Sequence, residues 1–191
     1  VLAADARAHG DSEGTKIGMG WPERFDVIEW IKLIISWEPN AQIILHGVSM
    51  GAATVLMASG EELPENVKVI IADCGYTSEW DEFKCEANAL HIPWFPVLNA
   101  ASVMSRLRDG YDFKQASALE QVKQSRIPTL FIHGSDDELV PYSMLDKLYS
   151  AAACEKECLT VNGAGHALSS SVEPELYWNT VESFIDKYLE K

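Results

Sequence analysis

The sequence predicts an α/β fold in which helices cover both faces of a mostly parallel sheet. Short apolar runs rich in β-branched residues recur along the chain, and they lack the polar alternation of strands that have one solvated face. Segments of helical composition lie between these runs, and this alternation is typical of a parallel sheet. The length of 191 residues fits a single domain, residues 1–191, without internal repeats.

The formal net charge of −14 limits the classes of partner. Phosphates would repel such a chain, which argues against nucleic acid and against adsorption of the molecule to anionic membranes. No uninterrupted apolar run reaches membrane-spanning length, so we expect no membrane segment. The simplest interpretation of the charge is a solvated acidic surface that aids solubility.

The four cysteines form no C-x-x-C pair and have no histidine at ligand spacing, so we expect no metal site. A chain of this length can bury a core without disulfides, which favours free thiols in a reducing, cytoplasmic compartment. The first residue is not Met, and we expect the natural N-terminus to lie upstream, where a cell-surface anchor is an alternative to cytoplasmic location.

The chain opens on what we interpret as the tail of a strand, Val1 to Ala4, followed by an irregular loop with the sequence DARAHGDSEG. A helix should begin at Trp21-Pro22-Glu23, because proline and an acidic residue favour the first helical turn. It should end at Glu38-Pro39-Asn40, since proline disfavours helical backbone in the residue before it.

The stretch from Gln42 to Ala58 predicts a strand, a five-residue turn and a helix, with Ser49 at the centre of the turn. Ile43 to Leu45 form the apolar strand, and small and apolar residues follow the turn. This arrangement is typical of a nucleophile elbow. The alternative is a tight strand-to-helix turn in which the serine has no chemical role.

The glycines of the turn have an expected steric reason. Gly47 and Gly51 lie two residues before and after Ser49, where side chains would crowd the neighbouring strand and helix. The helix that follows would point its N-terminal N–H groups at a developing oxyanion, and the Met50 N–H is the expected donor.

A further buried strand is expected at Val67 to Ala72, after which the periodicity breaks from about residue 76 to residue 125. We interpret this segment as an inserted cap that forms a substrate pocket; ordinary core packing of its aromatic residues is an equal alternative. The pocket candidates are Tyr76, Trp80, Trp94 and Phe95.

Strand patterns return at Pro128 to His133 and at Leu159 to Asn162, and an amphipathic helix from Pro174 to Tyr188 closes the chain. The buried stripe of this helix is expected to comprise Leu176, Val181, Phe184, Ile185 and Tyr188.

The two late strands end in loops that carry a base and an acid. His166 follows one strand, whereas Asp136, Asp137 and Glu138 follow the other. Because the carboxyl ends of parallel strands meet at one edge of the sheet, these side chains should lie near Ser49. A serine hydroxyl needs such a base, and the base needs an acid to orient it. The remaining histidines are expected to be structural or exposed: His9, His46, His91 and His133.

Four motifs, DARAHGDSEG, GVSMG, HGSDDELVP and GAGH, together resemble the serine α/β-hydrolase superfamily over nearly the whole chain. The segments HGVSMGAAT and ADCGYTS are most similar to bacterial esterases and serine aminopeptidases. The resemblance implies that Ser49 is the nucleophile, His166 the base and Asp137 the acid, with Asp136 as the fallback. It also implies a cap before the acid-bearing strand and no requirement for a metal or an organic cofactor.

The chain departs from this family at its start: in the family the DARAHG loop follows the fourth strand, and the first three strands are absent here. The loop that supplies the second oxyanion donor is absent with them. We therefore expect these residues to be part of a longer chain. Alone, they should leave the strand at Val1 to Ala4 either displaced or paired directly with Ile43 to Leu45.

The expected function is hydrolysis of a small-molecule carboxylic ester through an acyl-enzyme on Ser49. An aminopeptidase-type serine peptidase is the first alternative, since acidic residues of the cap could bind a substrate amine; they could equally form a solvated helix face. A non-catalytic binding module on the same fold is the second alternative. The acidic residues concerned are Glu79, Asp81, Glu82 and Glu86.

Overall fold

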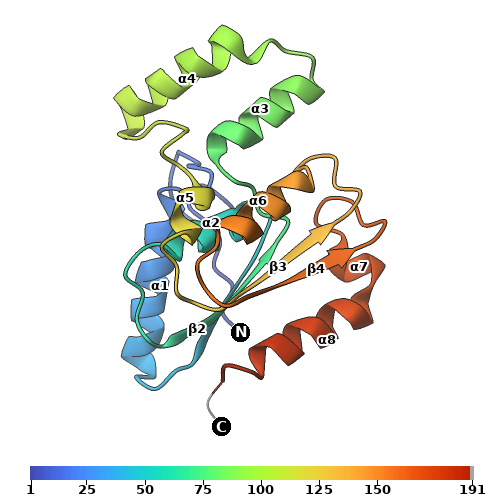
Figure 1. Ribbon diagram of the computed structural model, residues 1–191. Helices are drawn as coiled ribbons and strands as arrows, with labels where there is room; N and C mark the ends of the chain where they lie inside the picture. Colours follow the sequence, from blue (N-terminus) through green and yellow to red (C-terminus); the bar gives the residue numbers. More distant parts are fainter. Residues whose placement is uncertain (190–191) are drawn as a thin grey trace.

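The computed structural model describes residues 1–189, and a twisted parallel sheet lies at its centre (Figure 1). The sheet has the strand order β1-β2-β3-β4, and each neighbouring pair is parallel. In the register of the central strands, Ile71 lies opposite Leu130. The predicted α/β fold is confirmed. The strands are β1 (Ile43–Val48), β2 (Val67–Asp73), β3 (Thr129–Gly134) and β4 (Lys156–Val161).

Helices cover both faces of this sheet. One face carries α1 (Glu23–Trp37), α2 (Met50–Ala58), α5 (Ala118–Val122) and α6 (Ser143–Ala151). The other face carries α7 (Ser169–Val172) and α8 (Pro174–Ile185). Each helix within residues 1–189 is too short or too polar to cross a lipid bilayer.

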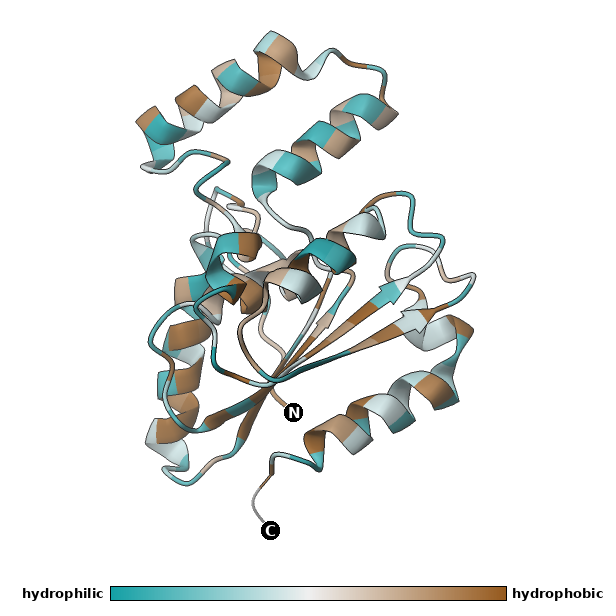
Figure 2. Ribbon diagram, viewed as in Figure 1, coloured by the Kyte–Doolittle hydropathy of each residue, from teal (hydrophilic) through white to brown (hydrophobic). Residues whose placement is uncertain are grey.

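The two central strands are buried on both sides, as their continuous apolar runs predict. Ile70 packs into the core under α2, while its neighbour Ile71 packs into the core under α8. In β3, Phe131 and Leu130 divide between the two cores in the same way. Hydropathy colouring shows these strands as largely hydrophobic ribbons (Figure 2).

The buried stripe of the last helix differs by one position from the predicted one. Leu176 is 46% exposed, whereas Tyr177 is 1% exposed and lies in the core with Val181 and Phe184. Tyr177, Val181 and Phe184 are spaced four and three residues apart, so they share one face of α8. A tyrosine occupies this inward position because its hydroxyl finds hydrogen-bonding partners inside the protein.

The prediction of a strand at Val1 to Ala4 is wrong, since these residues have no regular secondary structure. In the described chain β1 pairs with β2 only, so one edge of β1 lacks a neighbouring strand. A groove of about 1320 Å³ lies beside that edge, bordered by the first residues, α1 and α2. Because the segment gains no ladder hydrogen bonds without a partner, it takes the displaced arrangement.

The segment between β2 and β3 contains two helices that stand away from the sheet, α3 (Glu79–Ala89) and α4 (Trp94–Asp109) (Figure 1). The two helices pack against each other. The third helix of the segment, α5, packs instead on α2 and α6 in the body of the protein. The name "α3–α4 hairpin" is used below for residues 79–109.

Candidate active site

Ser49 lies in a strained turn between β1 and α2. Its backbone has φ 53° and ψ −118°, a left-handed conformation that is costly for a residue with a side chain. The Ser49 N–H donates to the Asp73 carbonyl at 2.8 Å, which fixes the turn against β2. The following residue, Met50, is the first residue of α2, so its N–H lies at the helix N-terminus where intrahelical acceptors are lacking.

The two glycines of the turn have different environments. A Cβ atom on Gly47 would lie 2.2 Å from the carbonyl oxygen of Gly51, so only glycine fits there. A Cβ on Gly51 would meet no atom within 4 Å. The expected steric reason therefore holds for Gly47 and is wrong for Gly51, whose α-carbon borders the open groove beside β1.

Three side chains from different strand ends form a hydrogen-bonded relay. The Ser49 hydroxyl lies 2.8 Å from Nε2 of His166. On the other side of the ring, Nδ1 of His166 lies 2.8 Å from Oδ2 of Asp137. A carboxylate only accepts, so Nδ1 carries the proton and Nε2 of a neutral ring accepts from the serine hydroxyl. The arrangement can transfer the serine proton to the imidazole.

Asp137 is buried and accepts several hydrogen bonds, whereas its acidic neighbours Asp136 and Glu138 are exposed. Its Oδ1 accepts from the backbone N–H groups of Leu139 and Val140 at 3.0 and 2.9 Å. Burial alone would raise its pKa, but the hydrogen bonds from His133, His166 and the Val140 N–H outweigh burial and hold the pKa below its ordinary value.

His133 is a neighbour of the acid that the sequence indicates only as a packed histidine. Its side chain is 1% exposed, and Nε2 lies 2.9 Å from the Val140 carbonyl and 3.3 Å from Oδ2 of Asp137. Both of these oxygen atoms can only accept a hydrogen bond, so Nε2 is the protonated nitrogen of the ring. In the sequence His133 lies four residues before Asp137 at the end of a strand. This spacing indicates a contact between the two side chains only when the loop between them folds back.

Cys74 brings a buried thiol close to the same residues. The potential ligand atoms of Cys74, Asp137 and His166 lie within 4.8 Å of one another, the one such cluster in the described residues. Burial, with a smaller contribution from Asp73, raises the thiol pKa to about 12, so the thiol is protonated at neutral pH. Because both ring nitrogens of His166 already have hydrogen-bonding partners, the cluster fits a proton relay better than a metal site.

A buried polar network lies behind the elbow. The Tyr177 hydroxyl lies 3.0 Å from Nε2 of His46 and also bonds to the carboxyl of Asp73. The Ser169 hydroxyl donates to Oδ1 of Asp73 at 3.2 Å. Burial raises the pKa of Asp73, although these hydrogen bonds oppose the shift. The network connects β1 and β2 with the two helices that follow His166.

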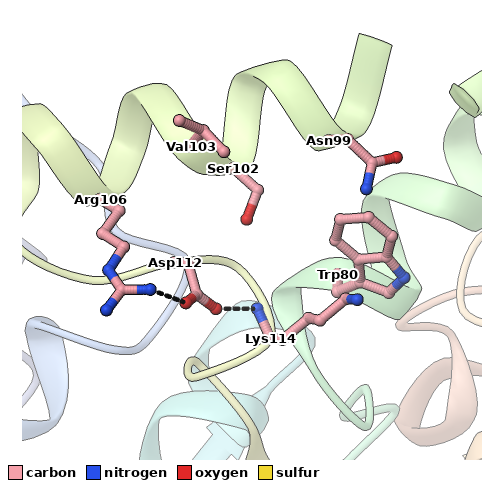
Figure 3. Close-up of a pocket in the computed structure, with 7 residues that line it drawn as sticks. All are labelled: Trp80, Asn99, Ser102, Val103, Arg106, Asp112 and Lys114. Atoms are coloured by element: carbon pink, nitrogen blue, oxygen red, sulfur yellow. Dashed lines mark hydrogen bonds and ion pairs between the residues drawn. The ribbon is translucent and has the colours of Figure 1, made fainter. Parts of the chain in front are cut away.

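The four aromatic pocket candidates do not share one environment. Tyr76 is 2% exposed, and its hydroxyl donates to the Met19 carbonyl at 2.9 Å, so it lies in the core rather than in an open pocket. Trp80 lines a cavity of about 220 Å³ between the α3–α4 hairpin and the segment that follows it (Figure 3). In this cavity Arg106 points toward Asp112, and Nζ of Lys114 lies 4.5 Å from the centre of the Trp80 ring.

The other two aromatic candidates lie at the start of α4. Trp94 makes edge contacts with Trp80 and Phe95, with ring centroids 6.4 and 6.2 Å apart. Phe95 is 66% exposed and faces solvent. The contacts of Trp80 and Trp94 hold the α3–α4 hairpin together, and their role in substrate binding stays a prediction.

Two acidic residues of α3 are buried, contrary to the solvated-face interpretation. Glu79 and Glu82 are each 3% exposed, and the Oε2 atom of each has no hydrogen-bonding partner within the described part of the chain. Burial raises the pKa of both carboxyls to about 8, with smaller contributions from Glu23 beside Glu79 and from Glu86 beside Glu82. Their i, i+3 spacing places both on one face of the helix.

Solved structures with the same fold include esterases and peptidases. Esterase Pf2001 of Pyrococcus furiosus aligns with a TM-score of 0.76 and 22% identity, over 97% of this chain and 69% of that chain. An acylaminoacyl peptidase of Pyrococcus horikoshii aligns with a TM-score of 0.69 and 17% identity, over 91% of this chain and 29% of that chain. At these identities the likeness establishes the fold.

Sequence relatives extend well beyond this chain. The chain is 30% identical to the uncharacterized protein YqkD of Bacillus subtilis over 188 residues, which are 97% of this chain and 62% of that protein. It is 29% identical to the lysophosphatidylserine lipase ABHD12 of Macaca fascicularis over 154 residues, 80% of this chain and 38% of that protein. The chain thus spans less than two thirds of the length of both relatives.

The family model of the prolyl oligopeptidase family matches residues 23–191. This match includes the elbow, the acid loop and the histidine loop, and the expected superfamily is confirmed by it together with the structural likeness. The chain belongs to the prolyl oligopeptidase family, within the serine α/β-hydrolase superfamily.

Proposed function

We propose that this chain carries the catalytic residues of a serine hydrolase that cleaves carboxylic esters through an acyl-enzyme on Ser49. The observation that carries the proposal is the continuous relay from Ser49 Oγ to His166 and on to Asp137, with both hydrogen bonds at 2.8 Å. The relatives named as esterase, lipase and peptidase support an acyl-transfer reaction of this class.

In the proposed mechanism, Nε2 of His166 removes the proton from Ser49 as the hydroxyl attacks the ester carbonyl. Asp137 holds the ring in the reactive tautomer and stabilises the imidazolium. The imidazolium then gives its proton to the departing alcohol, and the serine is left acylated. In the second half, His166 removes a proton from water as the water attacks the acyl group, and the imidazolium returns that proton to Ser49 Oγ as the acid is released.

The Met50 N–H is the proposed oxyanion donor, since it lies at the positive end of α2 directly after the nucleophile. One missing donor lowers turnover by about a hundred- to a thousand-fold. The groove beside β1 lies next to Gly47 and Met50, so a segment seated there could provide a second donor.

Labelling with a fluorophosphonate followed by intact-mass analysis tests the nucleophile. We expect one adduct on the full-length protein and none on its Ser49→Ala variant, because only a serine activated by a base attacks the phosphonyl centre. Ser135→Ala, which removes an exposed serine near the acid loop, is the matched control and should keep the adduct. An adduct that persists in Ser49→Ala would disprove the assignment, and no adduct on either protein would favour the binding-module alternative.

The aminopeptidase-type activity is a second candidate, and the buried carboxyls of Glu79 and Glu82 favour it. Their Oε2 atoms lack hydrogen-bonding partners within residues 1–189, so a substrate ammonium group that reached them would favour the ionised, accepting form of these carboxyls. Comparison of kcat/KM for p-nitrophenyl esters and for aminoacyl p-nitroanilides separates the two activities. Faster cleavage of the anilides, lost in Glu82→Gln, would replace the esterase proposal by the peptidase proposal.

A further inference from the structure

We propose that the outer face of the α3–α4 hairpin is a docking surface for anionic phospholipid membranes. This inference concerns binding and does not depend on the hydrolytic activity proposed above.

The first observation is a concentration of exposed apolar side chains. Leu107 is 78% exposed, the highest value among the exposed large hydrophobic residues beyond the first residue of the chain. Figure 2 shows hydrophobic segments along α4, which stands away from the body of the protein. Contiguous exposed apolar surface marks a binding surface in most soluble proteins. The exposed members are Leu90, Ile92, Phe95, Val97, Val103, Met104 and Leu107.

The second observation is that the amphipathicity of α4 is inverted. The buried residues of this helix are Leu98, Ser102 and Ser105, so two of the three inward side chains are serines. Both serines form hydrogen bonds with the segment that follows the hairpin: Ser105 donates to the Tyr111 carbonyl, and Ser102 accepts from the Phe113 N–H. A helix folded only for water would place its apolar residues inward. The apolar face of α4 therefore suits an apolar environment outside the protein.

The third observation is the local charge. The chain has 29 acidic residues among 191, yet none lies between Glu86 and Asp109, while Arg106 and Arg108 lie in the last turn of α4. Salt screens charges beyond about 10 Å, and the hairpin projects away from the acidic body (Figure 1). The exposed side of α4 is thus apolar and has arginines at its C-terminal end, where the Arg106 side chain is 74% exposed although it lies 3.8 Å from Asp112.

These features favour a lipid surface over a second copy of the chain. A second copy would present the same face, which has no acidic residue between Glu86 and Asp109 to pair with the arginines, whereas anionic headgroups complement them. A helix with an apolar face and basic residues at its edge is typical of segments that lie in the membrane interface. Such docking would place the hairpin in the headgroup region and leave the sheet in water.

Vesicle flotation tests the proposal. The full-length protein would carry Ser49→Ala, so that no lipid is consumed, and would be mixed with vesicles of phosphatidylcholine alone or with added phosphatidylglycerol. We expect binding to the anionic vesicles that weakens at high salt. Met104→Gln with Leu107→Gln should lower the partition coefficient about tenfold or more, because both exposed side chains lose apolar area that enters the interface. Both positions are exposed, so thermal unfolding should be unchanged.

The matched control is Val172→Gln with Leu176→Gln, which changes two exposed apolar residues on the helices α7 and α8 and should float like the parent protein. Three outcomes would overturn the proposal: no flotation with either vesicle, equal flotation of the α4 variant, or equal loss in the control variant. A dimer in solution that the α4 variant dissociates, without vesicle binding, would assign the surface to a second copy instead.

Discussion

Asp137 is distinguished from the adjacent acids by the donors that surround it. Its two oxygens face two backbone N–H groups and the rings of His133 and His166, whereas the Asp136 carboxyl accepts from the Ser135 hydroxyl at the surface. A carboxylate held by several donors stays ionised and fixed, which is what an orienting acid requires.

Asp137→Asn should lower kcat by about a thousand- to ten-thousand-fold, since an amide in this position favours the wrong tautomer of His166. KM should change little because Asp137 does not reach the substrate. Steady-state kinetics on a p-nitrophenyl ester measures this effect. Asp136→Asn is the matched control; if it lost as much activity as Asp137→Asn, the acid would have to be reassigned.

The buried carboxyls of Glu79 and Glu82 predict a pH dependence of stability. Their folded pKa of about 8 lies above the ordinary 4.5, so each carboxyl is protonated when folded and ionised when unfolded between these values. Stability should therefore fall as pH rises from about 4.5 to about 8, by a few kcal/mol for each group. Glu82→Gln should stabilise the protein at pH about 8 and change little at pH about 4.5.

Urea unfolding at both pH values measures this difference. The exposed Glu175→Gln serves as the control and should show the same small effect at both. Equal stability of Glu82→Gln and the parent at the higher pH would mean that Glu82 is ionised in the folded protein, paired with a cation.

At the scale of the elements, the elbow depends on a close approach of strand and helix. The start of α2 lies so near β1 that the backbone of Gly51 occupies the place of a side chain at position 47. The sequence shows two equivalent glycines around Ser49, and only the folded turn reveals that one of them is required for space.

Gly47→Ala should abolish fluorophosphonate labelling, because a Cβ 2.2 Å from the Gly51 carbonyl forces the turn apart. Gly51→Ala should keep the labelling and raise the unfolding free energy by about 0.5 to 1 kcal/mol, the usual gain of alanine over glycine in a helix. Labelling and thermal unfolding of the two variants give the comparison. Loss of labelling in Gly51→Ala would show that the groove beside β1 is filled in the functional protein.

Much of the element pattern was predictable from the sequence, but the α3–α4 hairpin was not. The central strands β2 and β3 are largely apolar, and such runs are stable inside a sheet covered on both faces, whereas the edge strand β4 also carries Lys156 and Glu157. The α4 segment has a stripe of serines inward and apolar residues outward. Such a helix has no ordinary buried apolar stripe, which is why the periodicity breaks in this part of the sequence.

At the scale of the whole molecule, β1 forms one edge of the sheet in the described residues. β1 is paired on one side, and residues 1–4 lie exposed without regular structure. The strands β2 and β3 lie between neighbours and under helices on both faces. Local stability should consequently be lowest at the open edge.

Hydrogen exchange followed by mass spectrometry should show this gradient in the isolated 191-residue chain. The backbone amides of residues 1–4 should exchange at nearly the rate of an unfolded chain. The amides of β1 should exchange faster than those of β2 and β3. If these residues belong to a longer chain whose further sequence seats in the groove, exchange in β1 should be slower in that longer chain. Slow exchange of residues 1–4 in the isolated chain would contradict the displaced arrangement.

The sequence by itself determined the parallel sheet, the elbow around Ser49 and the identity of His166 and the acid loop as candidates, because local periodicity and turn composition act over a few residues. Only the tertiary structure decided which acid meets His166, that Tyr76 lies in the core, that Glu79 and Glu82 are buried and that α4 turns its apolar side to solvent. These outcomes depend on contacts between segments that are far apart in the chain. A local sequence pattern does not specify which distant segment a given residue will contact.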